Sequence, residues 1–232
     1  LSIDTVAPRI EISWDSNDGR RGRYYNHNRT ATVRVYERNF DPNSTHISVS
    51  GGNAQISGWS IGEQNGSSDE NVSYATVTFS EDGDYTFSVS ATDLAGNHSQ
   101  QSYNDLFTID KTVPTINVSW DKGLVNGKYV TGSRTATITV HEHNFDASGF
   151  TADVKAMLES QGIPASSVSG WSSNGDTHTA TLTFSADGDY SFNLNFEDMA
   201  GNKANSYSEN EFTVDSTNPN IEFGGVADGS SN

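Results

Sequence analysis

The chain has 232 residues, with 30 Asp and Glu against 13 Lys and Arg, and a formal net charge of −17. A field of this sign repels phosphate backbones and anionic lipids, so nucleic acid and direct membrane contact are excluded as expected partners. Cysteine is absent, which excludes disulfides and thiolate metal sites.

The chain repeats itself with a period close to 105 residues. The segment 29–41, RTATVRVYERNFD, returns as RTATITVHEHNFD at 134–146. We therefore expect two tandem domains, residues 1–109 and residues 110–215, because each repeat is long enough for one small domain. Residues 216–232 are expected to begin a truncated third repeat or to form a linker.

Strands are predicted for most of each repeat by the alternation of apolar and polar residues. In the first repeat, the segments 31–35, 75–79 and 85–91 place Ala, Val, Phe or Tyr at every second position, which is typical of strands with one face on a core. About seven short strands per repeat, with turn residues between them, predict an immunoglobulin-like β-sandwich. Tyr85 and Tyr190 stand where the hydroxyl of a tyrosine caps the corner before the sixth strand of that fold.

The second repeat carries an insertion that predicts a helix. Segment 150–162, FTADVKAMLESQG, spaces Phe150, Val154, Met157 and Leu158 along one helical face. We expect a short helix that bridges the two sheets, so the predicted fold class is all-β with one helix inserted in the second domain. A loop that differs between the repeats indicates either ligand binding or neutral divergence.

Three short motifs resemble those of bacterial Ig-like repeats in large surface proteins and adhesins. They are Ile-Asp-x-x-x-Pro at 109–114, Asp-Gly-Asp-Tyr at 82–85 and Asp-x-Ala-Gly-Asn at 93–97, and both repeats contain all of them. The resemblance implies an extracellular stalk or adhesive module, in which Ca²⁺ often stiffens the joints between domains. It names no ligand.

A composite Ca²⁺ site at the joint is one hypothesis for the acidic loops. In a seven-stranded sandwich, the loops before and after the sixth strand lie at opposite ends, so acidic loops of neighbouring domains should meet at the linker. Ca²⁺ binds about six to eight hard oxygens. The candidate ligands are Asp82, Asp84, Asp110, Glu142, Asp146, Asp198 and Asn202. The alternative is that these residues only form Asx-turns.

A basic run on this acidic chain is the candidate ligand-binding face. It consists of Arg20, Arg21, Arg23 and Tyr25, and the second repeat has KGLVNGK in its place. The alternative is an ordinary solvated hairpin loop. The four tryptophans occur in both repeats, so they indicate core packing more than a sugar-stacking surface.

Catalysis is not expected, because every acidic motif occurs in both repeats, as framework residues do. We therefore expect a non-enzymatic, extracellular module of a bacterial surface protein, anchored to the cell wall through regions outside these residues. The leading function is binding or adhesion to a host protein, immunoglobulin included, or to a glycan, with neighbouring Ig-like repeats as further partners. The alternatives are a structural stalk or spacer, or an accessory region of a secreted carbohydrate-active enzyme. No cofactor other than Ca²⁺ is expected.

Overall fold

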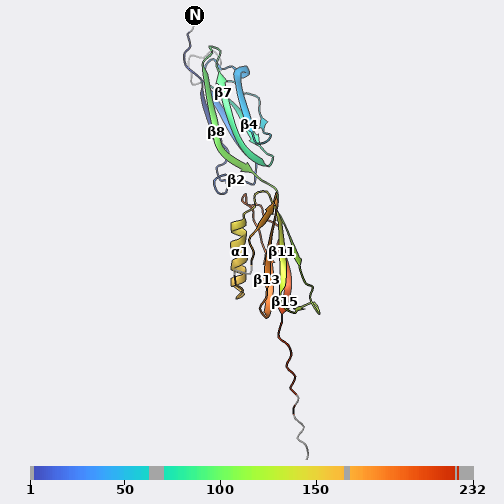
Figure 1. Cartoon of the computed structure of the whole chain (residues 1–232). Coiled ribbons are helices and arrows are strands. Elements are labelled where there is room, and N and C mark those ends of the chain that lie inside the picture. Colours follow the sequence, from blue (N-terminus) through green and yellow to red (C-terminus); the bar gives the residue numbers. More distant parts are fainter. Residues whose placement is uncertain (1–2, 63–70, 165–167, 223, 225–232) are drawn as a thin grey trace, which may run out of the picture.

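Two β-sandwiches follow one another end to end along the chain (Figure 1). The computed structural model describes residues 3–62, 71–164, 168–222 and 224. Each sandwich has its own cluster of buried apolar residues, one within residues 25–109 and the other within residues 130–214. The predicted all-β fold of two tandem immunoglobulin-like domains is therefore confirmed. Part of the predicted third repeat, 223 and 225–232, lies outside the described residues, and 216–222 contain no strand.

Two four-stranded sheets form the first sandwich. Its elements are β1 (Arg9–Trp14), β2 (Tyr24–Tyr25), β3 (Arg29–Tyr36), the 3-10 helix η1 (Pro42–Ser44), β4 (Thr45–Ser50), β5 (Gln55–Ile56), β6 (Val72–Phe79), β7 (Gly83–Thr92) and β8 (His98–Ile109). One sheet has the order β1-β3-β6-β5 and the other the order β2-β8-β7-β4. Short β2 runs parallel to the end of β8, just before the linker.

The second sandwich repeats this plan with one change. Its elements are β9 (Thr115–Trp120), β10 (Tyr129–Val130), β11 (Arg134–His141), α1 (Ala147–Glu159), β12 (Ser172–Asn174), β13 (Thr177–Phe184), β14 (Gly188–Leu194) and β15 (Tyr207–Val214). One sheet has four strands, β12-β13-β11-β9, and the other has three, β10-β15-β14. Helix α1 occupies the place in the chain that η1 and β4 occupy in the first sandwich.

The inserted helix begins earlier than the sequence pattern predicts. It runs from Ala147 to Glu159, because the side chain of Asp146 accepts the N–H of Gly149 at 3.1 Å and so caps the first turn. Phe150, Val154 and Leu158 are buried, as the helical spacing predicts. These side chains pack α1 against the hydrophobic core of the second sandwich.

A buried arginine and a tryptophan cover one end of each core. The Arg29 guanidinium lies 3.7 Å from the ring centre of Trp14, and Trp14 lies 5.2 Å from Phe107. Arg134 lies 3.9 Å over Trp120 in the same way. These tryptophans therefore pack on the core, and the buried arginines are held by cation–π contacts.

The tyrosine corner forms in both sandwiches as predicted. The hydroxyl of Tyr85 donates to the carbonyl of Glu81 at 2.9 Å, and that of Tyr190 donates to the carbonyl of Ala186 at 2.7 Å. These bonds fix the turns that carry the Asp-Gly-Asp motifs.

Candidate cation site at the joint between the domains

Asp110 belongs to the hydrogen-bond networks of both domains. It follows β8, and its N–H donates to the carbonyl of Tyr25 at 2.9 Å. On the other side, its Oδ2 accepts from Asn144 Nδ2 at 2.8 Å, and its carbonyl oxygen accepts from Asn202 Nδ2 at 2.8 Å. The linker is thus fixed at the point where the second domain begins.

Three buried carboxylates meet at this joint. Asp110 and Glu142 are each 3% exposed and Asp198 is 2% exposed. One oxygen of each lies within 4.8 Å of the others. Glu142 directly follows β11, and Asp198 lies in the loop after β14. The cluster therefore offers only oxygen donors, which suit a hard cation such as Ca²⁺.

Asp198 also forms the turn that the alternative interpretation predicts. Its Oδ1 accepts the N–H groups of Ala200, Gly201 and Asn202 at 2.8, 2.7 and 2.9 Å. Gly201 has a φ of 96°, a conformation that favours glycine. The Oδ2 of Asp198 accepts from Asn202 Nδ2 at 2.8 Å, so the turn uses both oxygens of Asp198 and holds its carboxylate in the cluster.

Glu142 has a buried oxygen without a partner. Its Oε1 accepts the N–H of Asn144 at 2.7 Å, whereas Oε2 has no hydrogen-bond partner among the described residues. Burial raises the pKa of Glu142 to about 7, and the charges of Asp110 and Asp198 add to the rise. Burial likewise raises the pKa of Asp110. Unpaired buried charge is costly, so a bound cation would stabilise this arrangement.

The first domain has an equivalent cluster with a built-in positive charge. Asp4, Glu37 and Asp93 also bring one oxygen each within 4.8 Å. There, Arg38 Nε lies 3.4 Å from Asp4 Oδ2. His143 stands at the position of Arg38 in the second repeat, and it contacts Asp176 instead, with Nδ1 2.8 Å from Oδ1.

No ion pair reaches Asp110, Glu142 or Asp198 in the described part of the chain. The 105-residue period could have located the equivalent cluster from the sequence, but only the structure shows that one cluster has a protein cation beside it and the other has none.

The structure brings four of the seven predicted cation ligands together and places the other three elsewhere around the joint. Asp82 accepts the N–H of Lys111 at 2.9 Å and the hydroxyl of Thr112 at 2.6 Å, so it fixes the linker. Asp84 accepts from the Thr108 hydroxyl and lies 3.3 Å from Arg23 Nη2. Asp146 caps α1. These carboxylates surround the joint without joining the cluster, whereas Asp110, Glu142, Asp198 and Asn202 do meet.

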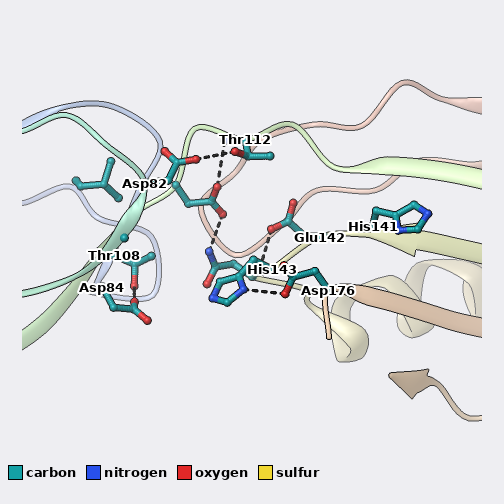
Figure 2. Close-up of a pocket in the computed structure, with 12 residues that line it drawn as sticks. Asp82, Asp84, Thr108, Thr112, His141, Glu142, His143 and Asp176 are labelled. Atoms are coloured by element: carbon teal, nitrogen blue, oxygen red, sulfur yellow. Dashed lines mark hydrogen bonds and ion pairs between the residues drawn. The ribbon is translucent and has the colours of Figure 1, made fainter. Parts of the chain in front are cut away.

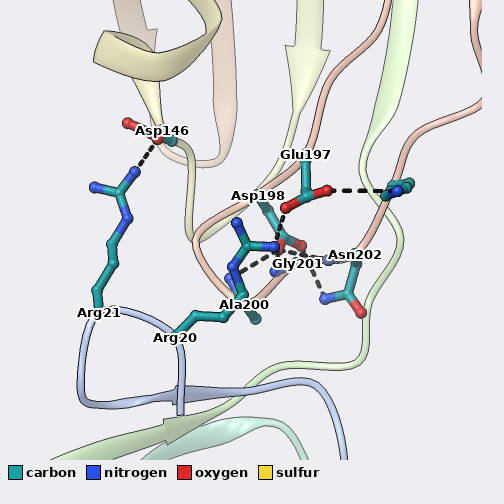
Figure 3. A network of polar contacts seen from close by, with 9 residues as sticks. Arg20, Arg21, Asp146, Glu197, Asp198, Ala200, Gly201 and Asn202 are labelled. Carbon is teal, nitrogen blue, oxygen red and sulfur yellow. Dashed lines mark hydrogen bonds and ion pairs between the residues drawn. The ribbon is translucent and has the colours of Figure 1, made fainter. Parts of the chain in front are cut away.

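The basic run, which the sequence predicts as a ligand-binding face, lies at the joint, where two of its arginines reach the second domain (Figure 3). Arg20 pairs with Glu197 of the second domain, and Arg21 pairs with Asp146. Arg23 contacts Asp84, and Tyr25 is only 3% exposed. A buried ring cannot offer a stacking surface, and the two arginines that cross the joint are already paired with carboxylates.

An acidic groove of about 470 Å³ opens beside the cluster (Figure 2). Its lining contains carboxylates from both domains and neither lysine nor arginine. The carboxylates are those of Asp82, Asp84, Asp110, Glu142 and Asp176. The hydrogen bond that His143 donates to the Asp176 carboxylate raises the pKa of His143, which lies at the rim. His141 Nδ1 contacts the hydroxyl of Thr177 at 3.0 Å. The groove therefore attracts cations.

The fold and this joint define a class, namely tandem immunoglobulin-like β-sandwiches linked through an acidic junction. Residues 68–178 match the model of the bacterial Ig-like domain (group 3). The match runs from just before β6 in the first sandwich to the start of β13 in the second. No helix among the described residues is long and apolar enough to cross a membrane.

Comparison with solved structures gives a weaker likeness. The crystal structure of dimeric latent PorU from Porphyromonas gingivalis is 13% identical, with a TM-score of 0.30. The alignment covers 92% of this chain and 24% of that one, so this chain spans about a quarter of its length. A search of curated proteins found no match.

Proposed function

We propose that this chain is a non-enzymatic segment of a bacterial cell-surface protein, in which a divalent cation at the joint holds two Ig-like domains in line. The match to a bacterial Ig-like domain supports the class. The single observation that carries the cation site is Glu142 Oε2, a buried oxygen without a described partner, within a cluster of three buried carboxylates.

Ca²⁺ fits the donors of the joint. Asp110, Glu142 and Asp198 would hold it, and the ion would supply the positive charge that Arg38 supplies in the first domain. Oxygens that bind Ca²⁺ at about 2.3–2.6 Å can lie up to about 5 Å apart, whereas the shorter Mg²⁺ bonds of about 2.1 Å require a tighter cluster. The three oxygens of the cluster lie within 4.8 Å of one another, close enough to share one Ca²⁺ ion.

The test is a calcium titration of the full chain by calorimetry, with melting measured in Ca²⁺ and in EGTA. We expect Ca²⁺ to raise the melting temperature of the wild type and Glu142→Gln to abolish the increase. Glu37→Gln is the matched control, because the equivalent cluster already has Arg38 beside it. A melting temperature unchanged by EGTA, together with no heat of calcium binding, would refute the proposal.

Binding to a host protein or glycan is the second proposed function, with immunoglobulin among the candidate proteins. It is favoured by the difference between the domains, since both keep the sandwich while the second replaces β4 with α1. The test is capture of host glycoproteins, immunoglobulins and glycans by the full chain. Retention of none of them would support a purely structural spacer.

A further inference from the structure

One edge of the second sandwich lacks a strand that the first sandwich has. In the first, β4 pairs with β7 over the whole length of β4, from Thr45 opposite Ala91 to Ser50 opposite Thr86. In the second, α1 replaces β4, and β14 pairs with β15 alone among the described strands. A helix uses its own backbone hydrogen bonds internally, so α1 covers the core without pairing with the edge of β14.

The backbone groups of β14 show which residues face this open edge. The N–H of Ser191 points outward and donates to Gln161 Oε1 at 2.9 Å. Because N–H and C=O groups alternate in direction along a strand, those of Asn193 face the same edge, and Asn195 is the residue that directly follows the end of β14. Their counterparts in the first repeat, Ser88 and Ser90, face β4. Asn193 and Asn195 are exposed, and Gln161 covers only the end of the edge.

A groove runs beside this edge. A hollow of about 230 Å³ lies between α1 and β14, lined by Phe150, Asp153, Val154, Met157, Asn193, Leu194 and Asn195. Asp153 and Asn195 also line an adjoining hollow of about 330 Å³, which includes Glu197 and Lys203. The groove thus combines an apolar wall on the helix, an unpaired strand edge and carboxylates at its rim.

We propose that this groove accepts one extended strand of a partner polypeptide, which pairs with Asn193 and Asn195. The inference rests on the proposed binding role and identifies the surface that performs it. Strand β4 is the template within this chain, since Ile47 and Val49 of its sequence THISVS are half-buried and the alternate residues His46, Ser48 and Ser50 are exposed. The partner strand therefore carries β-branched apolar residues at alternate positions.

Charge adds a second requirement for the partner. In the β4 template, His46 pairs with Ser90, whose counterpart is Asn195 beside Asp153. A basic residue at the position of His46 would therefore face the carboxylate of Asp153, whereas Glu197 is already paired with Arg20 and Lys203. Main-chain hydrogen bonds give such a complex its affinity, and the alternate side chains give it specificity.

The test uses a peptide with the sequence of residues 44–51 and lysine in place of His46, added to the full chain and followed by NMR. The amide signals of Asn193 and Asn195 should shift and saturate, while those of Ser88 and Ser90, already paired with β4, should not. A peptide methylated on the backbone nitrogens that pair with β14 should bind at least about tenfold more weakly, because its side chains are unchanged and its donors are lost.

Two variants and one matched control locate the binding surface. Asp153→Lys should weaken the peptide about threefold or more, whereas Glu159→Lys makes the same charge change on the same helix outside the groove and should not. Asn193→Pro removes one outward N–H and should abolish pairing. If Asn193→Pro does not fold, the methylated peptide tests the same hydrogen bonds.

Several outcomes would overturn the inference. They are equal binding of the methylated peptide, shifts that map away from β14, and no shift at millimolar peptide. A dimer formed through β14 in sedimentation would make a second copy the occupant and would also overturn it. Host capture that is unaffected by Asp153→Lys would overturn this inference while leaving the binding role in place. None of these measurements depends on calcium.

Discussion

At pH 8 in EGTA, which removes Ca²⁺, replacing Glu142 by Gln should stabilise the second domain. In Ca²⁺, the same change should remove the stabilisation that the metal gives to this domain. A pKa raised from 4.5 to about 7 corresponds to a difference of ~3 kcal/mol between the two protonation states. The folded chain binds this proton more tightly than the unfolded chain. Protonation of Glu142 therefore adds its full contribution to the free energy of unfolding below pH 4.5, and this contribution is lost as the pH rises through about 7.

Glutamine avoids this loss because it carries no charge. Its Oε1 can still accept the N–H of Asn144, and its amide can donate to the carboxylates beside it. In EGTA we expect the variant to exceed the wild type by ~1–3 kcal/mol at pH 8 and to match it near pH 4. In saturating Ca²⁺ the order should reverse, because the variant has lost a charged ligand.

Urea denaturation at pH 4, 6 and 8, in EGTA and in Ca²⁺, measures these free energies of unfolding. Tryptophans in both domains report on the unfolding transition, and Glu37→Gln serves as the matched control in the first domain. A Glu142→Gln variant less stable than the wild type in EGTA at pH 8 would show that the Glu142 carboxylate is already compensated without a metal. That result would refute the electrostatic reasoning.

Four further changes test other parts of the structure. Asp82→Ala should lower calcium affinity although Asp82 lies outside the cluster, because it frees the N–H of Lys111 and the hydroxyl of Thr112; calorimetry measures the change. The double change of Arg20 and Arg21 to Ala should alter unfolding by under about 1 kcal/mol, since both side chains are half exposed, but should broaden the interdomain distances seen by small-angle scattering. Arg134→Ala should cost ~3 kcal/mol in urea denaturation, because it removes the contact over Trp120 and leaves a cavity. Tyr190→Phe should cost ~1 kcal/mol in the same assay through loss of the corner hydrogen bond.

The fold was predictable because its signals are local and repeated. Alternating apolar residues in 134–141 and the helical spacing of Phe150, Val154 and Leu158 predict elements that the structure contains. The start of α1 was less predictable, since an N-cap depends on one side chain, and Asp146 had been interpreted as a metal ligand. The periodicity of apolar residues therefore predicted which strands and helices form better than it predicted the residues at which they begin and end.

The candidate site was predictable only in part, because carboxylate partners depend on side-chain direction and on the neighbouring domain. Asp110, Glu142 and Asp198 meet as expected. Asp82 and Asp84 lie at the correct end of the first domain, but one turns to the linker and the other to Thr108. Nothing in the sequence shows which acidic groups the arginines at 20 and 21 will meet, so a basic run near an acidic loop cannot be assigned to a ligand or to a joint.

The linker is shaped by the domain before it and completes the cluster of the domain after it. Asp82 holds Thr112 through its hydroxyl, and Asp187 holds Thr217 in the same way at 2.7 Å after the second domain. Asp110 and Asp215 each accept an N–H from the threonine two residues later. Residues 216–217 form these bonds without belonging to a strand, so the segment after each domain is held by carboxylates of the domain before it. A cation on Asp110 would therefore connect the second domain to a linker that the first already holds, and the two domains would move as one body.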